Sequence, residues 1–435
     1  MAKIVIIGAG SGFGSRLSID ILARAALADS TIALCDIHAE RLEQVRDYVQ
    51  RAIDGHGLPG KVIASTDRAE LLPGADCVVT AVSIGGAAYW GEPYRSEVEI
   101  PLKYGVEQTV ADTIGVGGIF RFLRTADEHL NFAKDMERHC PDALMLNYTN
   151  PMCMLTWLHS VGSSIENVGL CHSVQGTTKK LAKGVGVDYG DVSYMVAGIN
   201  HQAWVLRLRQ GNEDLYPKLR EIVDNDEAFA DDRVRVEMMK QFGYFVTEST
   251  RHNAEYLPYF RRNRELLDLY GLKPREPVSM ENNRQRDWMK DSGVEDNGEA
   301  ALPPLQESHE YASLIIEARL TGAPFAFNGN VMNHGSITNL PARCCVEVPC
   351  LADREGVHPT FVGELPPQCA ALNMTNIAVQ ELAVRAVLDR DREAAFHACA
   401  LDPLTAATVS LPDIREMFEE LWAAEGDRLS YFHAG

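Results

Sequence analysis

The sequence lacks a hydrophobic run long enough for a membrane span or a signal peptide. Its strongly apolar stretch near the start extends only from Ile4 to Ile7, whereas a signal-peptide core needs roughly 7 to 15 such residues. No stretch approaches the roughly 18 apolar residues of a transmembrane helix. We therefore expect a cytoplasmic protein with no membrane partner. Its 435 residues, 46% of them hydrophobic, suffice for two or three domain cores.

Blocks of positive charge are missing as well. The chain has 41 basic and 61 acidic residues, which gives a formal net charge of −20. Nucleic acids and anionic membranes bind clustered Lys and Arg side chains. We therefore expect no nucleic-acid partner.

Paired cysteine spacings are the third absence. Structural zinc sites usually supply four ligands in closely spaced pairs, and the ten cysteines show no such pairs. A chain of this size in a reducing compartment has little need of disulfides. We expect most of its thiols to be buried and inert.

The first part of the chain has the pattern of a dinucleotide-binding fold. An apolar strand at Lys3–Ile7 runs into "GAGSGFGS", and a helical pattern follows. Gly8 permits a tight turn, Gly10 lets the backbone approach a pyrophosphate, and the helix N-terminus favours its charge. Phe13 stands where the usual third glycine belongs, with Gly14 one position later.

A second apolar strand, "TIALCDI", ends in Asp36. A carboxylate there binds the ribose hydroxyls and repels a 2′-phosphate, which favours NAD over NADP. Strands at 62–64 and 76–86 complete a βαβαβ unit whose loop at 82–86 would follow the cofactor. A Rossmann-like sheet that binds nothing is the alternative. The residues expected at the cofactor are Gly8, Gly10, Ser11, Gly12, Phe13, Asp36, Val82 and Ile84.

Polar residues end three later strands. Asn150 closes "DALMLNYTN", Cys171 and His172 close "ENVGLCH", and His201 closes "YMVAGINH". Strand carboxyl ends face the ligand crevice in such sheets. Asn150 is therefore placed to bind a substrate hydroxyl, although a cap for the helix after Pro151 fits equally well.

Cys171 and His201 offer the donor atoms of a metal site. Two protein ligands leave several positions open, which suits a catalytic ion. Ordinary core residues are one alternative, and a nucleophilic pair of Cys171 and His172 is another, although adjacent strand residues point to opposite faces. Asp112, before a glycine-rich turn, is either a surface acid or the neighbour of a tyrosine that acts as a base.

In their order along the chain these segments resemble glycoside hydrolase family 4, the NAD- and divalent-metal-dependent glycosidases. The resemblance runs from Lys3 to about Pro349. Besides the segments above it includes "LCDIHAERL", "IPLKYG", "DTIGVGG", "LNYTNPM", "GLCHSVQG", "GINHQAW", "TESTRHNAEYLPYF" and "NGNVMNHGSITNLPARCCVEVP".

The resemblance implies a reaction in which NAD⁺ oxidises the sugar at C3, the C2 proton is removed, the aglycone is eliminated, water adds and NADH returns the hydride. Seven residues receive roles from it: Cys171 and His201 as ligands of Mn²⁺, Tyr256 as the base, Asp112 as the group that raises its basicity, His172 as candidate general acid, and Asn150 and Arg95 as substrate-binding residues.

The segment Cys171–Val174 ("CHSV") is similar to the α-galactosidase type of the family. Enzymes for 6-phosphoglycosides usually carry Asp or Asn in place of His172, and α-galacturonidases carry Glu in place of Ser173. The expected substrate is therefore a neutral α-galactoside. Another α-glycosidase of the family is one alternative. An NAD-dependent sugar dehydrogenase and an inactive NAD-binding regulator are alternatives from other classes.

The expected fold is α/β, with an N-terminal Rossmann-like doubly wound parallel sheet followed by a C-terminal mixed α/β domain. We expect the first domain to span residues 1–195 and the second, which would carry the substrate and metal site, residues 196–435. The family resemblance also implies a homodimer or homotetramer.

Overall fold

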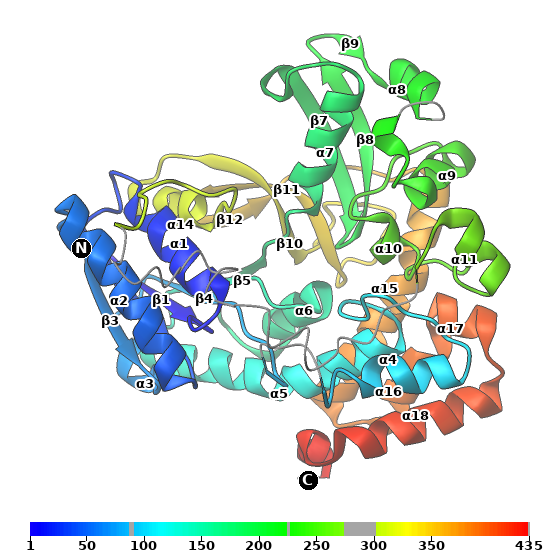
Figure 1. Ribbon diagram of the computed structural model, residues 1–435, viewed down its shortest axis with the longest axis horizontal. Coiled ribbons are helices and arrows are strands. Elements are labelled where there is room, and N and C mark those ends of the chain that lie inside the picture. The colour runs from blue at the N-terminus through cyan, green and yellow to red at the C-terminus, as the bar shows by residue number, and fades with distance from the viewer. Residues whose placement is uncertain (87–90, 224–226, 274–301, 434–435) are drawn as a thin grey trace.

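The computed structural model describes residues 1–86, 91–223, 227–273 and 302–433. Within these ranges one 12-stranded sheet runs through the molecule in the order β3-β2-β1-β4-β5-β6-β10-β11-β7-β8-β9, with β12 paired to β11 (Figure 1). The strands are β1 Lys3–Ile7, β2 Thr31–Cys35, β3 Lys61–Ser65, β4 Cys77–Thr80, β5 Leu144–Asn147, β6 Asn167–Gly169, β7 Val192–Ile199, β8 Gln202–Gln210, β9 Glu213–Asp214, β10 Phe325–Met332, β11 Cys345–Asp353 and β12 Gly356–Pro359.

The six strands from β3 to β6 are parallel. Both faces of β1 are buried, since Ile4 and Ile6 join one hydrophobic cluster while Val5 and Ile7 join another. The first cluster includes residues of helices α1 (Gly12–Leu22) and α2 (Ala39–His56), and the second includes residues of α3 (Arg68–Leu71) and of the end of α5 (Gly115–His139). Helices on both faces make continuous apolar strands stable. This confirms the expected α/β class with a Rossmann-like parallel sheet.

In the part of the chain that the structure describes, helices occur between the strands, and the last four helices follow the last strand. α15 packs against α5 and α6, and α18 packs against α4 and α5. The helices are α1 Gly12–Leu22, α2 Ala39–His56, α3 Arg68–Leu71, α4 Ser96–Lys103, α5 Gly115–His139, α6 Met152–Gly162, α7 Ser173–Gly184, α8 Tyr216–Ile222, α9 Arg233–Phe242, α10 Thr250–Asn253, α11 Arg264–Tyr270, α14 Ala312–Thr321, α15 Pro367–Asp389, α16 Arg392–Leu401, α17 Pro403–Thr408 and α18 Leu411–Glu425.

Strands from the second half extend the same sheet. β10 pairs antiparallel with β6 at Asn330 and Gly169, and β11 pairs with β7 at Glu347 and Gly198. The division expected after residue 195 falls inside β7 and stays a prediction. This continuity brings residues from both halves of the chain together at the ends of the strands.

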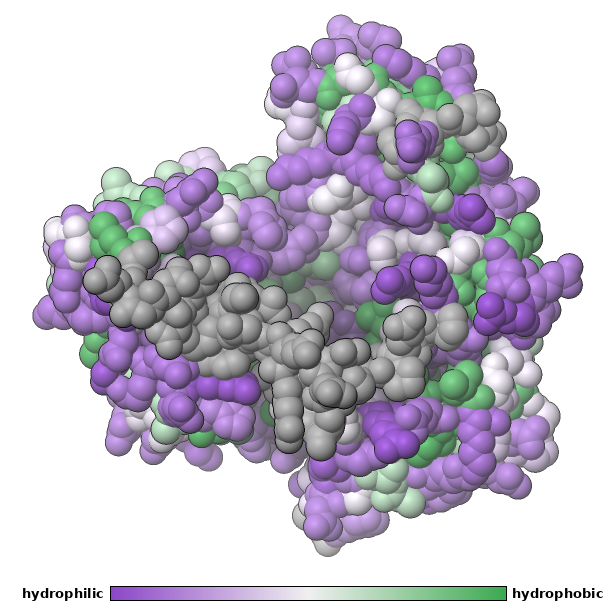
Figure 2. Space-filling model, in the orientation of Figure 1, coloured by the Kyte–Doolittle hydropathy of each residue, from purple (hydrophilic) through white to green (hydrophobic). Residues whose placement is uncertain are grey.

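The face in Figure 2 is mostly hydrophilic and the described helices are not long apolar spans, as the sequence leads one to expect. Hydrophilic side chains cover most of the face drawn in Figure 2. Among the described residues, no helix combines the length and apolarity needed to cross a bilayer.

Two buried histidines lie between α5 and α6. Nδ1 of His129 and Nε2 of His159 are 3.0 Å apart, and both side chains are fully buried. Burial lowers the pKa of His159 from 6.5 to about 4, and burial together with the neighbouring imidazole lowers the pKa of His129 well below its ordinary value. Both rings are therefore neutral in the folded protein at neutral pH.

This pair predicts a loss of stability in mild acid. The unfolded chain takes up protons below about pH 6.5 while folded His159 does not, so stability is full above pH 6.5 and falls as the pH approaches 4. For His159 alone, the free energy of unfolding should drop by about 2 kcal/mol between pH 7.5 and pH 5. In urea titrations at these two pH values, His159→Leu should show a drop smaller by that amount. An equal drop in both proteins would contradict the assignment.

Candidate active site

The ends of β6 and β7 place Cys171 and His201 beside each other. Cys171 lies two residues after the end of β6, and His201 lies in the turn between β7 and β8. Glu248 completes the group, since its carboxylate, the Cys171 thiol and the His201 imidazole offer ligand atoms that all lie within 4.8 Å of one another. The structure thus brings the two expected metal ligands together and adds a carboxylate.

The backbone at this cluster is strained. His201 and Glu248 both adopt left-handed conformations, with φ of 63° and 71°, and Ala111 beside Asp112 has φ of 51°. Such conformations are costly for residues with a side chain and concentrate at functional sites.

A chain of charged groups leads away from the cluster. His252 lies 3.2 Å from the Glu248 carboxylate through Nδ1 and 3.2 Å from Asp112 through Nε2. Burial alone would lower the pKa of His252, but Asp112 and Glu248 raise it well above the ordinary value. Burial would raise the pKa of Asp112, yet His252 lowers it below its usual range. A charged imidazole therefore stands between two ionised carboxylates.

Asn150 is fixed by the same acid. Its amide nitrogen donates to Asp112 Oδ2 at 3.1 Å. Helix α6 has Pro151 at its N-cap position and no side-chain cap, so Asn150 does not serve as the helix cap that its position in the sequence equally suggested. Its carbonyl oxygen remains available as an acceptor for a hydroxyl group.

Tyr256 is fully buried next to this network, with its ring centroid 6.4 Å from that of His201. Burial raises the pKa of its phenol well above the ordinary value, and the charges of Asp112 and Glu248 add to the rise. The Thr113 hydroxyl acts in the opposite direction. A phenolate here would be a strong base, which is the property expected of Tyr256. Its role as the base stays a prediction.

His172 lies at the start of α7 and binds an acid that the sequence did not single out. Its Nε2 is 2.5 Å from a carboxylate oxygen of Glu310, which is almost fully buried. Because 138 positions separate the two residues, no local sequence pattern predicts that they pair. The Tyr148 ring stacks on the His172 ring with 6.1 Å between centroids.

The packing around the glycine turn accounts for the shifted position of its third glycine. A Cβ on Gly8 would lie 2.2 Å from the Ala81 carbonyl oxygen, and one on Gly14 would lie 1.9 Å from the Ala9 carbonyl oxygen. Gly14 therefore permits the close packing of helix and turn that the third glycine usually permits. Phe13 instead packs on Tyr148, with ring centroids 5.2 Å apart. The irregular position of Phe13 does not loosen the turn.

The remaining expected cofactor residues surround this turn. Asp36 follows β2 and accepts hydrogen bonds from the Gly10 and His38 amides at 2.8 and 2.9 Å. Ser11 and Gly12 begin α1. The Val82 amide donates to the Thr149 hydroxyl, and the Ile84 carbonyl accepts from Arg124.

Arg95 lies apart from the cluster. Its side chain is 63% exposed and pairs with Glu99 one turn along α4. Among the described residues its side chain makes no hydrogen bond or ion pair with the other expected site residues.

The described residues satisfy some buried polar groups of the cluster poorly. Nδ1 of His201 has no hydrogen-bond partner among them, and burial raises the pKa of the neighbouring Glu347 carboxyl well above its ordinary value. Burial lowers the pKa of His201, so its ring is neutral and has a lone pair for a cation. Unsatisfied polar groups are costly in a dry interior, and a thiol, an imidazole and a carboxylate suit a divalent transition metal. The residues present therefore fit a metal ion.

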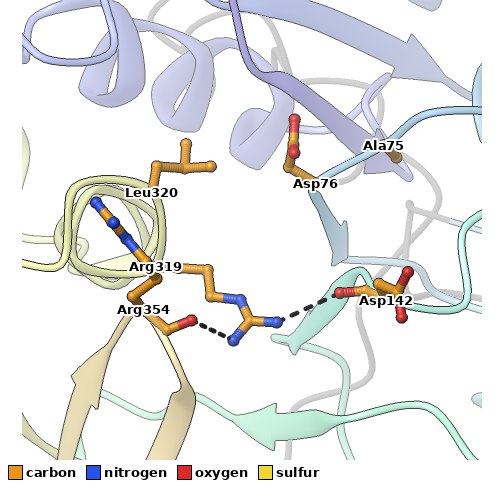
Figure 3. A pocket seen from close by; sticks show the side chains of 6 residues that line it. All are labelled: Ala75, Asp76, Asp142, Arg319, Leu320 and Arg354. Carbon is orange, nitrogen blue, oxygen red and sulfur yellow. Dashed lines mark hydrogen bonds between the residues drawn. The ribbon is translucent and has the colours of Figure 1, made fainter.

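A pocket with several polar groups in its lining lies at the opposite, amino ends of the parallel strands (Figure 3). Asp76 and Asp142 precede β4 and β5, so they mark the amino ends of the strands. The Arg319 guanidinium donates to the backbone carbonyls of Asp142 and Arg354. Its donors thus serve the fold, and we assign this pocket no chemistry.

Family models account for most of the chain. Residues 3–187 match the model of family 4 glycosyl hydrolases, and residues 196–405 match the model of the family 4 glycosyl hydrolase C-terminal domain. The chain is a family 4 glycosyl hydrolase. This confirms the resemblance found in the sequence.

Full-length relatives support the same assignment. The glycosyl hydrolase is 43% identical to an α-galactosidase of Bacillus subtilis, over 99% of each chain. The structure of LplD from Bacillus subtilis superposes with a TM-score of 0.86 at 26% identity, over 97% of this chain and 99% of that one. A 6-phospho-β-glucosidase of Thermotoga maritima with manganese, NAD⁺ and glucose 6-phosphate superposes with a TM-score of 0.80 at 21% identity, over 98% and 99%.

Proposed function

We propose that this glycosyl hydrolase is an α-galactosidase that requires NAD⁺ and Mn²⁺. The observation that carries the proposal is the meeting of three parts at the carboxyl edge of one sheet. These are the glycine turn with Asp36, the cluster of Cys171, His201 and Glu248, and the buried Tyr256. Two-carboxylate glycosidases have no need of a dinucleotide turn or of a metal site.

The cofactors are supported by the residues and by a structural neighbour. The Thermotoga maritima enzyme was solved with manganese and NAD⁺. In this chain, Cys171, His201 and Glu248 would hold the metal ion, and the turn at Gly8–Ser11 would hold the pyrophosphate. When bound, NAD⁺ supplies a hydride acceptor for the C3 hydroxyl and Mn²⁺ supplies a Lewis acid for the C3 carbonyl.

Side chains of this protein carry out the proton transfers and bind the sugar. Tyr256 removes the proton from C2, which the neighbouring carbonyl has made acidic. Asp112 fixes Asn150 through its amide nitrogen, and the carbonyl oxygen of Asn150 accepts a bond from a sugar hydroxyl. As the bond from C1 to the glycosidic oxygen breaks, His172 donates a proton to that oxygen. Arg95 stays a further, more remote candidate for substrate binding.

Galactose as the sugar rests on two supports. A 43% identical relative is an α-galactosidase. The two residues that follow Cys171 are His172 and Ser173, and they are those of the α-galactosidase type. Relatives named α-galacturonidase are 28–30% identical, and α-galacturonides and α-glucosides remain the competing substrates.

The test is release of p-nitrophenol from p-nitrophenyl α-galactoside in reductant, with NAD⁺ and Mn²⁺ each supplied or omitted. We expect release only when both are present, and no accumulation of NADH. Activity confined to an α-glucoside or α-galacturonide under the same double requirement would overturn the sugar. NADH accumulation without p-nitrophenol would identify a sugar dehydrogenase, and release without NAD⁺ and metal would contradict the mechanism.

Asp36 provides a prediction for the cofactor site. Asp36→Ala should raise the Kd for NAD⁺ about 10- to 100-fold, because charged hydrogen bonds to the ribose are lost. The preference over NADP⁺ should shrink, since the carboxylate no longer repels a 2′-phosphate. Calorimetric titration measures both, and Asp54→Ala, a change at an exposed acid on α2, serves as the control. Unchanged affinities in Asp36→Ala would place the ribose elsewhere.

A homodimer or homotetramer and a cytoplasmic location stay predictions. Light scattering behind a sizing column measures the first. Fractionation of cells that express the protein measures the second.

A further inference from the structure

Glu310 occupies an unusual place for an acid. Its side chain is 1% exposed, in the segment that leads into α14. One carboxylate oxygen binds Nε2 of His172 at 2.5 Å. An acid buried at such cost is retained where its charge has a partner.

The second oxygen of Glu310 faces the guanidinium of Arg16 and the ring of His309. Nη1 of Arg16, on α1, lies 3.7 Å from Oε1, and Nε2 of His309 lies 3.9 Å from it. His172, His309 and Glu310 are close enough together to hold a metal ion. The Arg16 guanidinium would repel a cation there, so the surroundings favour an ionised carboxylate that serves His172.

The His172 ring is held on three sides. The Tyr148 ring stacks on it, and the Tyr311 and His309 rings meet it edge to face with centroids 6.4 and 5.1 Å away. Because Nε2 is taken by Glu310, Nδ1 is the ring nitrogen left for a substrate. A carboxylate on one nitrogen orients the ring and stabilises the imidazolium when the other nitrogen acts on a substrate.

We propose that Glu310 is the positioning residue that makes His172 an effective general acid. This inference rests on the proposed α-galactosidase reaction. The electron pair left on C2 after its proton is removed forms the C1=C2 double bond. The bond from C1 to the glycosidic oxygen breaks with its electrons on the oxygen, which takes the proton from Nδ1 of His172. His172 is left neutral, with its remaining proton on Nε2 in the bond to Glu310.

Leaving groups of different acidity test this role. With Glu310→Gln, kcat for release of galactose from methyl α-galactoside should fall at least about 100-fold, because an alcohol leaves poorly without a proton. kcat on p-nitrophenyl α-galactoside should fall less than about fivefold, because the phenolate leaves unaided. Both substrates are assayed on one preparation, so the ratio of the two rates does not depend on how much of the variant folds.

Two further variants complete the design. Glu307→Gln makes the same change at a half-exposed acid that pairs with Arg24, and it should leave the ratio unchanged. His172→Ala should show the same loss on the methyl glycoside, and the double variant should lose no more than either single variant. Equal losses on both substrates, or losses that add in the double variant, would overturn the role of Glu310. If the wild-type enzyme lacked the requirement for NAD⁺ and Mn²⁺, the proposed function itself would fail.

Discussion

Tyr256→Phe is expected to lower kcat on p-nitrophenyl α-galactoside about 10²- to 10⁴-fold, the range for loss of a catalytic base. The phenol is fully buried beside the metal cluster, where burial and two carboxylates raise its pKa well above the ordinary value. Once ionised it is a strong base. A hydrogen bond with the Thr113 hydroxyl opposes the rise in the pKa. The variant lacks only the hydroxyl, so its affinities for NAD⁺ and Mn²⁺ should stay within about twofold.

A tyrosine three positions along provides the matched control. Tyr259 is 43% exposed and stacks on Phe242, so Tyr259→Phe should keep nearly full activity. Steady-state assays with both cofactors saturating measure the two variants. Activity of Tyr256→Phe within tenfold of the wild type would assign the C2 proton to another base.

Cys171→Ala is expected to weaken Mn²⁺ binding at least about 100-fold and to abolish turnover at ordinary Mn²⁺ concentrations. The thiolate supplies negative charge to the ion, and the neighbouring ligands alone offer one imidazole and one carboxylate. Electron paramagnetic resonance titrations distinguish free from bound Mn²⁺ and so measure the affinity directly. Cys140→Ala, which removes a buried thiol at the end of α5, should bind the ion normally.

The same thiol predicts how metal binding depends on pH. Burial raises the pKa of Cys171 to about 11, so the metal-free protein carries a neutral thiol at pH 7. Binding as a thiolate releases one proton, and the affinity for Mn²⁺ should rise about tenfold per pH unit near neutrality, in addition to any proton lost from other ligands. In Cys171→Ala this component of the slope should vanish. An affinity independent of pH would show that the thiol stays protonated or does not bind.

The parallel sheet and the positions of Cys171 and His201 were predictable because buried strands read as continuous apolar runs, and strand ends share one edge. The role of Gly14 could not be assigned from the sequence, because spacing does not reveal that a Cβ at this position would lie 1.9 Å from the Ala9 carbonyl oxygen. Glu248 and His252 belong to "TESTRHNAEYLPYF", a segment that the family resemblance includes. Their role depends on how α10 folds over the cluster.

Glu310 and Glu347 escaped prediction for another reason. Both come from segments far along the chain, and each meets its partners only through tertiary packing, Glu310 at His172 and Glu347 on β11 beside β7. Single acids in such segments read as surface charges. Their burial is what identifies them, and burial is a property of the fold.

The measurement that tests the account most directly is hydrolysis of an α-galactoside in D₂O, followed by analysis of the released galactose. If Tyr256 removes the C2 proton and solvent later replaces it, the product will carry deuterium at C2, in amounts that require NAD⁺ and Mn²⁺. Galactose released at full rate with hydrogen retained at C2 would contradict the elimination mechanism and the roles assigned to this site.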